Sequence, residues 1–489
     1  MAPWAARNIG IALILFSVQL AAADAPASLE LASRFRAAEA WMDQYMTSSV
    51  GPGASAAVVD GQRVAWTHAF GYADLETRQP ATPDTTYSIC SISKLFTSVA
   101  VMKLVEDGAM ELDAELGDYL EGFQPSVPVD VVGEPITIRD LLSHASGLPR
   151  EGVGAYWNTL EFPTEADLED TINQIGRLYT PGTNYQYSNI GMALLGKAVS
   201  QVTGKSYDSY VHEAILDPLG LGQVATDLPM DGTGGRFATG YTDHDASGRR
   251  DRVTPYQTRG LSPAAGYVGS VLDLAKFASW QFRLLATGDK EVLEASTLRD
   301  MQRVHWMDPF DPESSIFGLG FNHHKLGDVP VIGHDGYCLG HRAQFSIEPN
   351  LGIAVITMVN ANDISPTILA AGVYGLVSEL LSADDSESPR TGERLAQKVE
   401  SFQSLEGIYR WPGLPEGFYV IPGSNGDLEM ISLYSEDPSQ DSLAFRHVEG
   451  DLFRRIRKDR DLGESLLFER DSDGKVRSIL WEGYRYTRS

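Results

Sequence analysis

The chain has 489 residues, which is more than one compact domain usually contains, so we expect a large body and a smaller second unit. Hydrophobic residues make up 43% of the sequence and charged residues 21%, a composition that is typical of globular proteins and excludes wholesale disorder. The 39 Lys and Arg residues are outnumbered by 66 Asp and Glu residues, and the net charge of −27 repels phosphate backbones, so nucleic acid is not an expected partner.

Residues 1–23 have the pattern of a signal peptide. Arg7 is followed by an apolar stretch over residues 9–20, and the small residues 21–23 are typical of a cleavage site. An uncleaved membrane anchor is the alternative interpretation, although this stretch is short for a bilayer span. No later run of apolar residues is long enough to span a bilayer. We therefore expect a periplasmic or secreted protein without an integral membrane span after signal removal.

Two β-hairpins are predicted at opposite ends of the main body. The first joins residues 54–59 to residues 64–70 through an Asp-Gly turn, and the second joins residues 344–347 to residues 353–359 through a Pro-Asn-Leu-Gly turn. Helical segments lie between them. This order predicts an α+β fold, in which distant parts of the chain close one antiparallel sheet that is flanked by helices.

Two helices are the clearest of the segments between the hairpins. Residues 91–107 carry apolar side chains on nearly every face, which predicts a central buried helix ended by Gly108. Residues 189–203 are predicted to form a second helix, with Ser188 as N-cap and Gly204 as C-cap. A polar side chain in the first turn of the buried helix should therefore lie deep in the body.

The composition of the chain changes near residue 382. Residues 382–393 are charged, contain proline and lack apolar periodicity, so we predict a linker over residues 382–397. Short strand-like runs separated by turn residues then predict a small all-β C-terminal domain, a barrel or a sandwich, over residues 398–489. The predicted strands are residues 407–411, 428–434, 442–447, 452–456, 466–470 and 476–481.

The first candidate site combines Ser91 with Lys94, whose side chains lie one helical turn apart on the same face. Ser91 is a candidate nucleophile and Lys94 a candidate base, because burial lowers the pKa of a lysine. The N–H groups at the start of the helix suit a developing oxyanion. The same spacing recurs at Ser472 and Lys475 in a predicted turn, and a Lys94 that reaches solvent is the alternative interpretation.

Tyr187 and Asn189 form a second candidate pair, on the turn before the second helix. A phenol beside a lysine ammonium has a lowered pKa, so Tyr187 is a candidate carrier for the serine proton. The same spacing recurs at Tyr156 and Asn158. Alternatively, Tyr187 is a packing aromatic residue with a satisfied hydroxyl.

A third candidate group, His334 and Gly336, lies in the glycine-rich segment 333–340 before the second hairpin. His334 is a candidate electrostatic partner of the nucleophile, and the backbone N–H of Tyr337 is a candidate oxyanion donor. A histidine with a purely structural role is the alternative interpretation of His334.

In combination, these motifs resemble the serine penicillin-recognising family, which includes class C β-lactamases, D-Ala-D-Ala carboxypeptidases, D-aminopeptidases and family VIII esterases. The patterns S-x-x-K, Y-x-N and H-x-G occur in the family's order, and residues 137–149 and 188–196 also look like the family. The resemblance covers roughly residues 29–380. It implies a β-lactamase/transpeptidase-like body over residues 29–381, with an antiparallel sheet, flanking helices and a mostly helical subdomain.

The resemblance also implies roles for the motif residues. Ser91 would be acylated, Lys94 and Tyr187 would transfer its proton, and Asn189 would bind the substrate amide.

His334 and Gly336 would line the site, and the N–H groups of Ser91 and Tyr337 would form the oxyanion hole. Class C β-lactamases carry lysine at the place of His334, whereas histidine there looks like D-Ala-D-Ala carboxypeptidases, so β-lactams are the less expected substrates.

Cys90 and Cys338 are the two cysteines of the chain. The same two places are bridged in class A carbapenemases, which this sequence resembles at that detail. The resemblance implies a Cys90–Cys338 disulfide in an exported protein. Two buried free thiols are the alternative interpretation.

These features predict a secreted serine hydrolase that forms an acyl-enzyme on Ser91 and cleaves short acyl esters, D-amino-acid peptides or, less expectedly, β-lactams. No cofactor or metal is expected, the partner is a small-molecule or peptide substrate, and the oligomeric state stays open. The alternative is a penicillin-recognising binding protein with little or no catalysis, whose C-terminal domain binds a partner.

Overall fold

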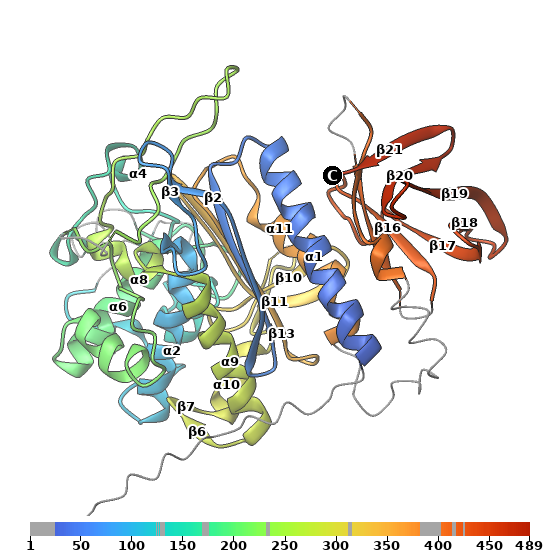
Figure 1. The fold of residues 1–489 in the computed structure, drawn as a ribbon. Coiled ribbons are helices and arrows are strands. Elements are labelled where there is room, and N and C mark those ends of the chain that lie inside the picture. The colour runs from blue at the N-terminus through green and yellow to red at the C-terminus, as the bar shows by residue number, and fades with distance from the viewer. Residues whose placement is uncertain are drawn as a thin grey trace, which may run out of the picture.

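The structure is a computed structural model that describes residues 25–489, apart from residues 124, 126, 128–132, 169–175, 231–234, 312–314, 382–401, 413–416 and 424–425. The described chain forms a body around one large sheet, with a β-barrel beside it (Figure 1). The predicted signal peptide 1–23 and the predicted linker 382–397 lie outside the described residues.

One antiparallel sheet forms the centre of the body. Its middle strands, β1 (Gly53–Asp60) and β13 (Ile353–Val359), pair with Ala54 opposite Val359. Both strands are buried on both faces, as expected for strands of small and β-branched residues that are covered by helices on each side. The pairing joins the two predicted hairpins. The strand order is β3 (Gln79–Pro80), β2 (Arg63–Asp74), β1, β13, β12 (His341–Glu348), β11 (Val329–Cys338), β10 (Asn322–Leu326), β9 (Ile316–Phe317) and β8 (Trp306–Met307).

Helices α1 (Ala25–Ser48) and α11 (Pro366–Leu381) cover one face of this sheet (Figure 1). They come from opposite ends of the body and pack closely. A Cβ on Gly372 would lie only 2.2 Å from the Trp41 ring, so only glycine fits at this point of contact. Neither helix is predicted from the residue pattern. The apolar run of α11 has no helical periodicity that would distinguish it from a buried strand.

The helical part of the body covers the opposite face, with α9 (Val271–Thr287) packed on β1 and β13. The predicted buried helix begins later than expected. Cys90–Ile92 form a 3₁₀ turn, η1, and the α-helix α2 (Ser93–Glu106) follows it, buried on nearly every face. The predicted caps of α6 (Asn189–Thr203) are confirmed, with the Ser188 hydroxyl accepting a backbone N–H and Gly204 at φ +68°.

The other short elements of the body connect these layers. They are β4 (Tyr87–Ser88), η2 (Leu116–Asp118), α3 (Ile138–Leu142), α4 (Tyr156–Thr159), α7 (Tyr207–Val211), η3 (His212–Leu216), η4 (Arg259–Leu261), α8 (Ser262–Ala265), β5 (Val268–Gly269), β6 (Lys290–Glu291), β7 (Leu293–Glu294) and α10 (Ala295–Gln302).

The C-terminal strands form a closed antiparallel barrel in which the first strand pairs with the last. Of the two predicted alternatives the barrel is therefore correct. The six predicted runs are strands, but β15 and β21 were not predicted: β15 is a short continuous apolar run without alternation, and β21 carries few apolar residues. After the turn η5 (Gln403–Leu405), the strands are β14 (Gly407–Arg410), β15 (Gly417–Pro422), β16 (Leu428–Ser432), β17 (Ser442–Glu449), β18 (Leu452–Ile456), β19 (Leu462–Arg470), β20 (Val476–Trp481) and β21 (Tyr484–Arg488).

The barrel packs against α1, on the side of this helix that faces away from the sheet (Figure 1). Glu406 lies at the centre of the contact and receives two hydrogen bonds from the Arg36 guanidinium, at 2.6 and 2.8 Å. Its carboxylate also accepts hydrogen bonds from Ser33 and Tyr419. Since the Glu406 side chain is only 9% exposed, this network ties the body to the barrel in a partly dry interface.

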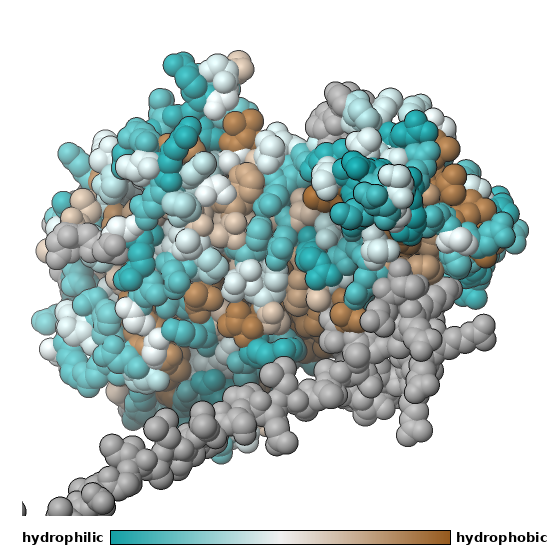
Figure 2. All heavy atoms as spheres, in the orientation of Figure 1, coloured by the Kyte–Doolittle hydropathy of each residue, from teal (hydrophilic) through white to brown (hydrophobic). Residues whose placement is uncertain are grey.

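Hydrophilic side chains predominate on the face shown in Figure 2, and hydrophobic residues occur there in small groups. This agrees with the large surplus of acidic residues. Within the described ranges, no helix has both the length and the hydrophobicity needed to cross a membrane.

Substitution of Glu406 tests the contact between body and barrel. Glu406→Ala leaves the Arg36 guanidinium and the Tyr419 hydroxyl without their carboxylate, so we expect a loss of about 1–3 kcal/mol in the free energy of unfolding, measured by urea denaturation. Glu449→Ala, at an exposed position of the barrel, is the matched control and should leave the midpoint unchanged. Equal midpoints for both variants would contradict the role of Glu406.

Candidate active site

Ser91 lies in the 3₁₀ turn η1, at the entrance to α2. The turn is held in place by its neighbours, since the Ser93 hydroxyl bonds to the Cys90 carbonyl and accepts the N–H of Tyr267 at 3.0 Å. Cys90 adopts φ +51°, a conformation that few residues other than glycine tolerate. The backbone is therefore bent sharply just before the serine, and the hydroxyl of Ser91 is partly exposed.

Lys94 lies directly beneath Ser91. Its Nζ is 3.1 Å from Ser91 Oγ and donates to the carbonyl of Ala264 in α8 at 2.7 Å. The residue is 1% exposed, so the alternative of a lysine that reaches solvent is wrong. Burial lowers the pKa of Lys94 to about 7, against a smaller opposing effect of the Glu151 carboxylate. Near neutral pH, an amine in this state can accept the proton of Ser91.

Tyr187 contacts the same two residues. Its hydroxyl is near enough to Ser91 for the serine to lower its pKa, and Lys94 Nζ lies 4.7 Å from the centre of its ring. The expected lowering of the Tyr187 pKa is wrong: burial of the hydroxyl raises this pKa, and the interaction with Ser91 offsets only part of the effect. Tyr187 therefore stays a neutral phenol, which can pass a proton between Ser91 and another group but is not the resting base.

Asn189 begins α6 and is buried. The Asn189 side-chain amide donates to a carboxylate oxygen of Glu151, and its backbone N–H donates to the Arg150 carbonyl at 2.9 Å. Its side-chain oxygen has no hydrogen-bond partner among the described residues. The amide of Asn189 is thus oriented by Glu151, with its acceptor atom unused.

His334 lies on β11 and is buried. Its Nδ1 bonds to the Asp335 carbonyl at 2.6 Å, and its ring lies 6.0 Å from that of Tyr187. Burial lowers the pKa of His334 to about 4, although the nearby Asp335 carboxylate opposes the effect. At neutral pH the imidazole of His334 is therefore uncharged, and its role as an electrostatic partner of the nucleophile stays a prediction. Its neutral Nε2 has no partner in the described part of the chain.

Gly336 allows β11 to approach η1. A Cβ at this position would lie 2.3 Å from the Ile89 carbonyl oxygen, so any other residue would push the strand away from the nucleophile. Tyr337 follows and pairs with Arg342, one step from the turn between β11 and β12. Since hydrogen-bonded and open pairs alternate along an antiparallel ladder, the N–H of Tyr337 is expected to point away from β12.

The outer edge of β11 is open beside the nucleophile. Strand β10 pairs with β11 only as far as Gly333, and no other described strand pairs with residues 334–338 on that side. Backbone groups of this edge, including the N–H of Tyr337, are therefore available to an extended substrate.

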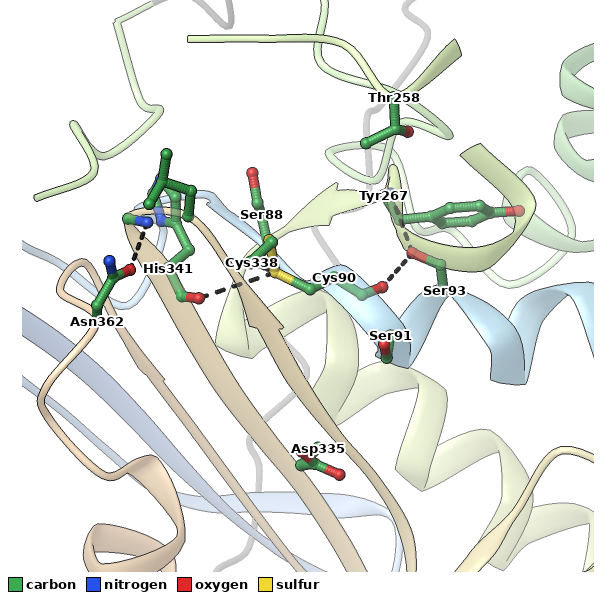
Figure 3. The surroundings of a disulfide bond; sticks show 12 residues. Ser88, Cys90, Ser91, Ser93, Thr258, Tyr267, Asp335, Cys338, His341 and Asn362 are labelled. Carbon is green, nitrogen blue, oxygen red and sulfur yellow. Dashed lines mark hydrogen bonds between the residues drawn. A yellow bond between two sulfur atoms is a disulfide. The ribbon is translucent and has the colours of Figure 1, made fainter. Parts of the chain in front are cut away.

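Cys90 and Cys338 form a disulfide bond with Cα atoms 5.8 Å apart, as the resemblance implied. The bond lies between η1 and the end of β11, with Ser91 next to Cys90 in the same turn (Figure 3). One cysteine precedes the nucleophile and the other follows Tyr337. The crosslink therefore joins the two backbone segments whose N–H groups were predicted to form the oxyanion hole.

Sequence reasoning missed Glu151 and Arg150. Glu151 bonds to Asn189 and accepts the Tyr156 hydroxyl at 2.7 Å, while the Arg150 guanidinium lies 4.9 Å from the Tyr187 ring. The two residues directly follow segment 137–149, which looks like the family, and their position there was the available signal.

The second occurrences of the motifs do not form sites. Tyr156, in α4, points its hydroxyl at Glu151, and Ser472 and Lys475 are exposed in a turn of the barrel. In the part of the chain that the structure describes, no three His, Cys, Asp or Glu side chains are arranged to hold a metal ion.

Comparisons with known proteins agree with this geometry. The family model described as Beta-lactamase matches residues 38–373, and the chain therefore belongs to the beta-lactamase family. A D-aminopeptidase of Brucella anthropi is 28% identical over 437 residues, which cover 85% of this chain and 76% of the relative. Unguisins hydrolase ungD' of Aspergillus campestris is 28% identical over 342 residues, which cover 68% of this chain but only 62% of the relative.

The fold is also similar to that of solved structures. The octameric penicillin-binding protein homologue from Pyrococcus abyssi has a TM-score of 0.62 and 24% identity, and the match covers 92% of this chain and 99% of the homologue. Family membership and the relatives are consistent with a serine hydrolase.

The titration of Lys94 predicts how the reactivity of Ser91 depends on pH. The amine accepts the serine proton only when neutral, so the rate of labelling by a fluorophosphonate should rise through pH 7 and then level off. At pH 5 the rate should be ~100-fold below the plateau, since each pH unit below the pKa costs a factor of about ten. Labelling is followed by intact mass, with Ser91→Ala as the unlabelled control. A flat profile between pH 5 and 9 would contradict Lys94 as the base.

Proposed function

We propose that this protein is an exported serine hydrolase that cleaves amide and ester bonds. Short acyl esters, and D-amino-acid peptides and amides with a free amino group, are its substrates ahead of β-lactams. The observation that carries the proposal is the 3.1 Å contact between Ser91 Oγ and the buried Nζ of Lys94. A hydroxyl beside an amine whose pKa is about 7 can lose its proton at neutral pH.

Acylation follows from this contact. As Ser91 Oγ bonds to the substrate carbonyl carbon, its proton passes to Lys94, directly or through the Tyr187 hydroxyl. The carbonyl oxygen becomes an oxyanion that the N–H groups of Ser91 and Tyr337 can stabilise. When the bond to the leaving group breaks, the amine or alcohol leaves with the proton, and an ester on Ser91 remains.

Deacylation reverses these roles. Water attacks the ester carbon and gives its proton to Lys94 and Tyr187. Ser91 Oγ then leaves the acyl carbon and recovers a proton from the same pair, which restores the enzyme and releases a carboxylic acid.

The surroundings of Asn189 support a substrate with a free amino group. The Glu151 carboxylate is near enough to act on the charge of Lys94, and it accepts from the amide of Asn189, whose buried side-chain oxygen has no hydrogen-bond partner among the described residues. A carboxylate and an amide oxygen are acceptors without donors of their own, so they suit an ammonium group. The D-aminopeptidase relative from Brucella anthropi supports the same substrate class.

The charge state of His334 supports placing β-lactams last. Its pKa of about 4 leaves it neutral at pH 7, so it does not supply the positive charge of the lysine that class C β-lactamases carry at this place.

The disulfide supports export. Cys90 and Cys338 are paired, and such bonds persist in oxidising compartments such as the periplasm or the extracellular space. The signal-like pattern of residues 1–23 supports the same localisation.

Replacement of the nucleophile is the direct test of the proposal. Ser91→Ala should lower p-nitrophenyl butyrate hydrolysis ~10³-fold or more, because the acyl-enzyme cannot form without the Ser91 hydroxyl. Ser472→Ala, the serine of the second S-x-x-K pattern, should hydrolyse the ester like the wild type. Equal, negligible rates from all three proteins, on esters and on D-alanine p-nitroanilide, would favour the non-catalytic binding protein instead.

The role of Glu151 is tested with paired substrates. Glu151→Gln removes the charge while it keeps an acceptor for Asn189, so kcat/KM for D-alanine p-nitroanilide should fall about 10- to 100-fold, the value of one charged hydrogen bond. The N-acetylated anilide, which lacks the ammonium, should be affected much less. Glu161→Gln, the same substitution at an exposed glutamate ten residues further along the chain, is the control. Equal losses on both anilides would show that Glu151 acts on the catalytic residues and not on the amino group.

A further inference from the structure

His144 lies behind Tyr187 and takes no part in the proposed chemistry. It is 1% exposed and adopts φ +58°, a left-handed conformation that is uncommon outside glycine and that asparagine, aspartate and histidine adopt more often than other residues. The contacts of its side chain and carbonyl show what this conformation achieves.

The hydrogen bonds of His144 enclose Tyr187 on both sides. The His144 carbonyl accepts the N–H of Gln186 at 2.8 Å, and its Nδ1 accepts the N–H of Ser188 at 3.2 Å. One residue thus binds the backbone immediately before and immediately after the tyrosine. The left-handed conformation directs the carbonyl and the ring to these two neighbours at once.

The ring of His144 also packs against the tyrosine itself. The two ring centres are 4.3 Å apart, and the other contacts of the imidazole are edge-on, with Phe317 at 5.1 Å and Tyr185 at 6.3 Å. Phe317 belongs to β9 of the large sheet. His144 therefore packs between the edge of the sheet and the Tyr187 ring.

The hydrogen bond to Ser188 requires a neutral imidazole, since a protonated ring would place an N–H opposite an N–H. Burial, assisted by the charge of Lys94, lowers the pKa of His144 well below its usual value, so the acceptor is available. Its Nε2 has no hydrogen-bond partner among the described residues and is shielded from solvent. His144 is therefore not a surface histidine that is solvated by water.

We propose that His144 is a positioning residue that holds Tyr187 beside Ser91 and Lys94, through two backbone hydrogen bonds and ring packing. The inference rests on the proposed serine hydrolase function, because it assigns His144 to the proton transfer from Ser91. It acts through Tyr187 and does not touch the substrate.

Two variants separate the parts of this role. His144→Asn keeps an acceptor for the Ser188 N–H and tolerates the left-handed conformation, so kcat for p-nitrophenyl butyrate should stay within ~10-fold of the wild type. His144→Gly also accommodates the backbone but loses the acceptor and the ring. Its kcat should fall ~100-fold with KM unchanged, the loss typical of a misplaced catalytic group.

A double-mutant cycle with Tyr187→Phe gives the decisive measurement. If His144 acts only by placing the tyrosine hydroxyl, the double variant His144→Gly/Tyr187→Phe should be within ~3-fold of Tyr187→Phe alone. Losses that multiply would overturn the proposal. The control His305→Asn removes another largely buried histidine, which bonds to Arg139, and should alter stability without a change in kcat.

The outcomes distinguish this inference from the proposed function. Absence of turnover in the wild type would contradict the hydrolase itself. A wild type that hydrolyses the ester while His144→Gly keeps its kcat, with both proteins folded by circular dichroism, would contradict only the role of His144.

Discussion

The contact between the buried amine of Lys94 and the hydroxyl of Ser91 is the interaction on which the rest of the structure depends. An ammonium group in an apolar helix is costly, so the fold must either pair the charge or keep the amine neutral. Here burial dominates, and the carbonyl of Ala264 supplies one acceptor. The helices around α2 therefore set the chemistry of the site by excluding water from a single nitrogen atom.

The large sheet brings the remaining groups to this nitrogen. Because β1 pairs with β13, the late hairpin lies beside the early part of the chain, and β11 reaches η1. Gly336 permits the close approach, and the disulfide between Cys90 and Cys338 keeps the two segments together. The geometry of the candidate oxyanion hole therefore depends on the pairing of the large sheet, which places β11 against η1.

Two of the motif residues around Ser91, Tyr187 and His334, are uncharged at neutral pH. Tyr187 has a raised pKa and His334 a lowered one, both mainly through burial. Charge enters instead from Glu151 at the edge of the site. This distribution suits a reaction in which one proton moves within a dry cluster while the substrate contributes its own charge.

Sequence reasoning predicted best where local rules decide. The caps of α6, the two hairpins, six strands of the barrel and the one-turn spacing of Ser91 and Lys94 follow from the residue pattern. It failed where burial comes from distant segments. Helix α11 has no periodicity because both its sides are covered, and the titration of Tyr187 and His334 depends on what packs around them.

By itself, the sequence therefore determined which residues are the candidates for the chemistry, their order along the chain and the family to which the chain belongs. Only the tertiary structure decided their protonation states, the pairing of Asn189 with Glu151 and the open edge of β11. The physical reason is that spacing along a helix or strand is a local property. Desolvation, in contrast, is the sum of contacts made by segments that meet only in the folded protein.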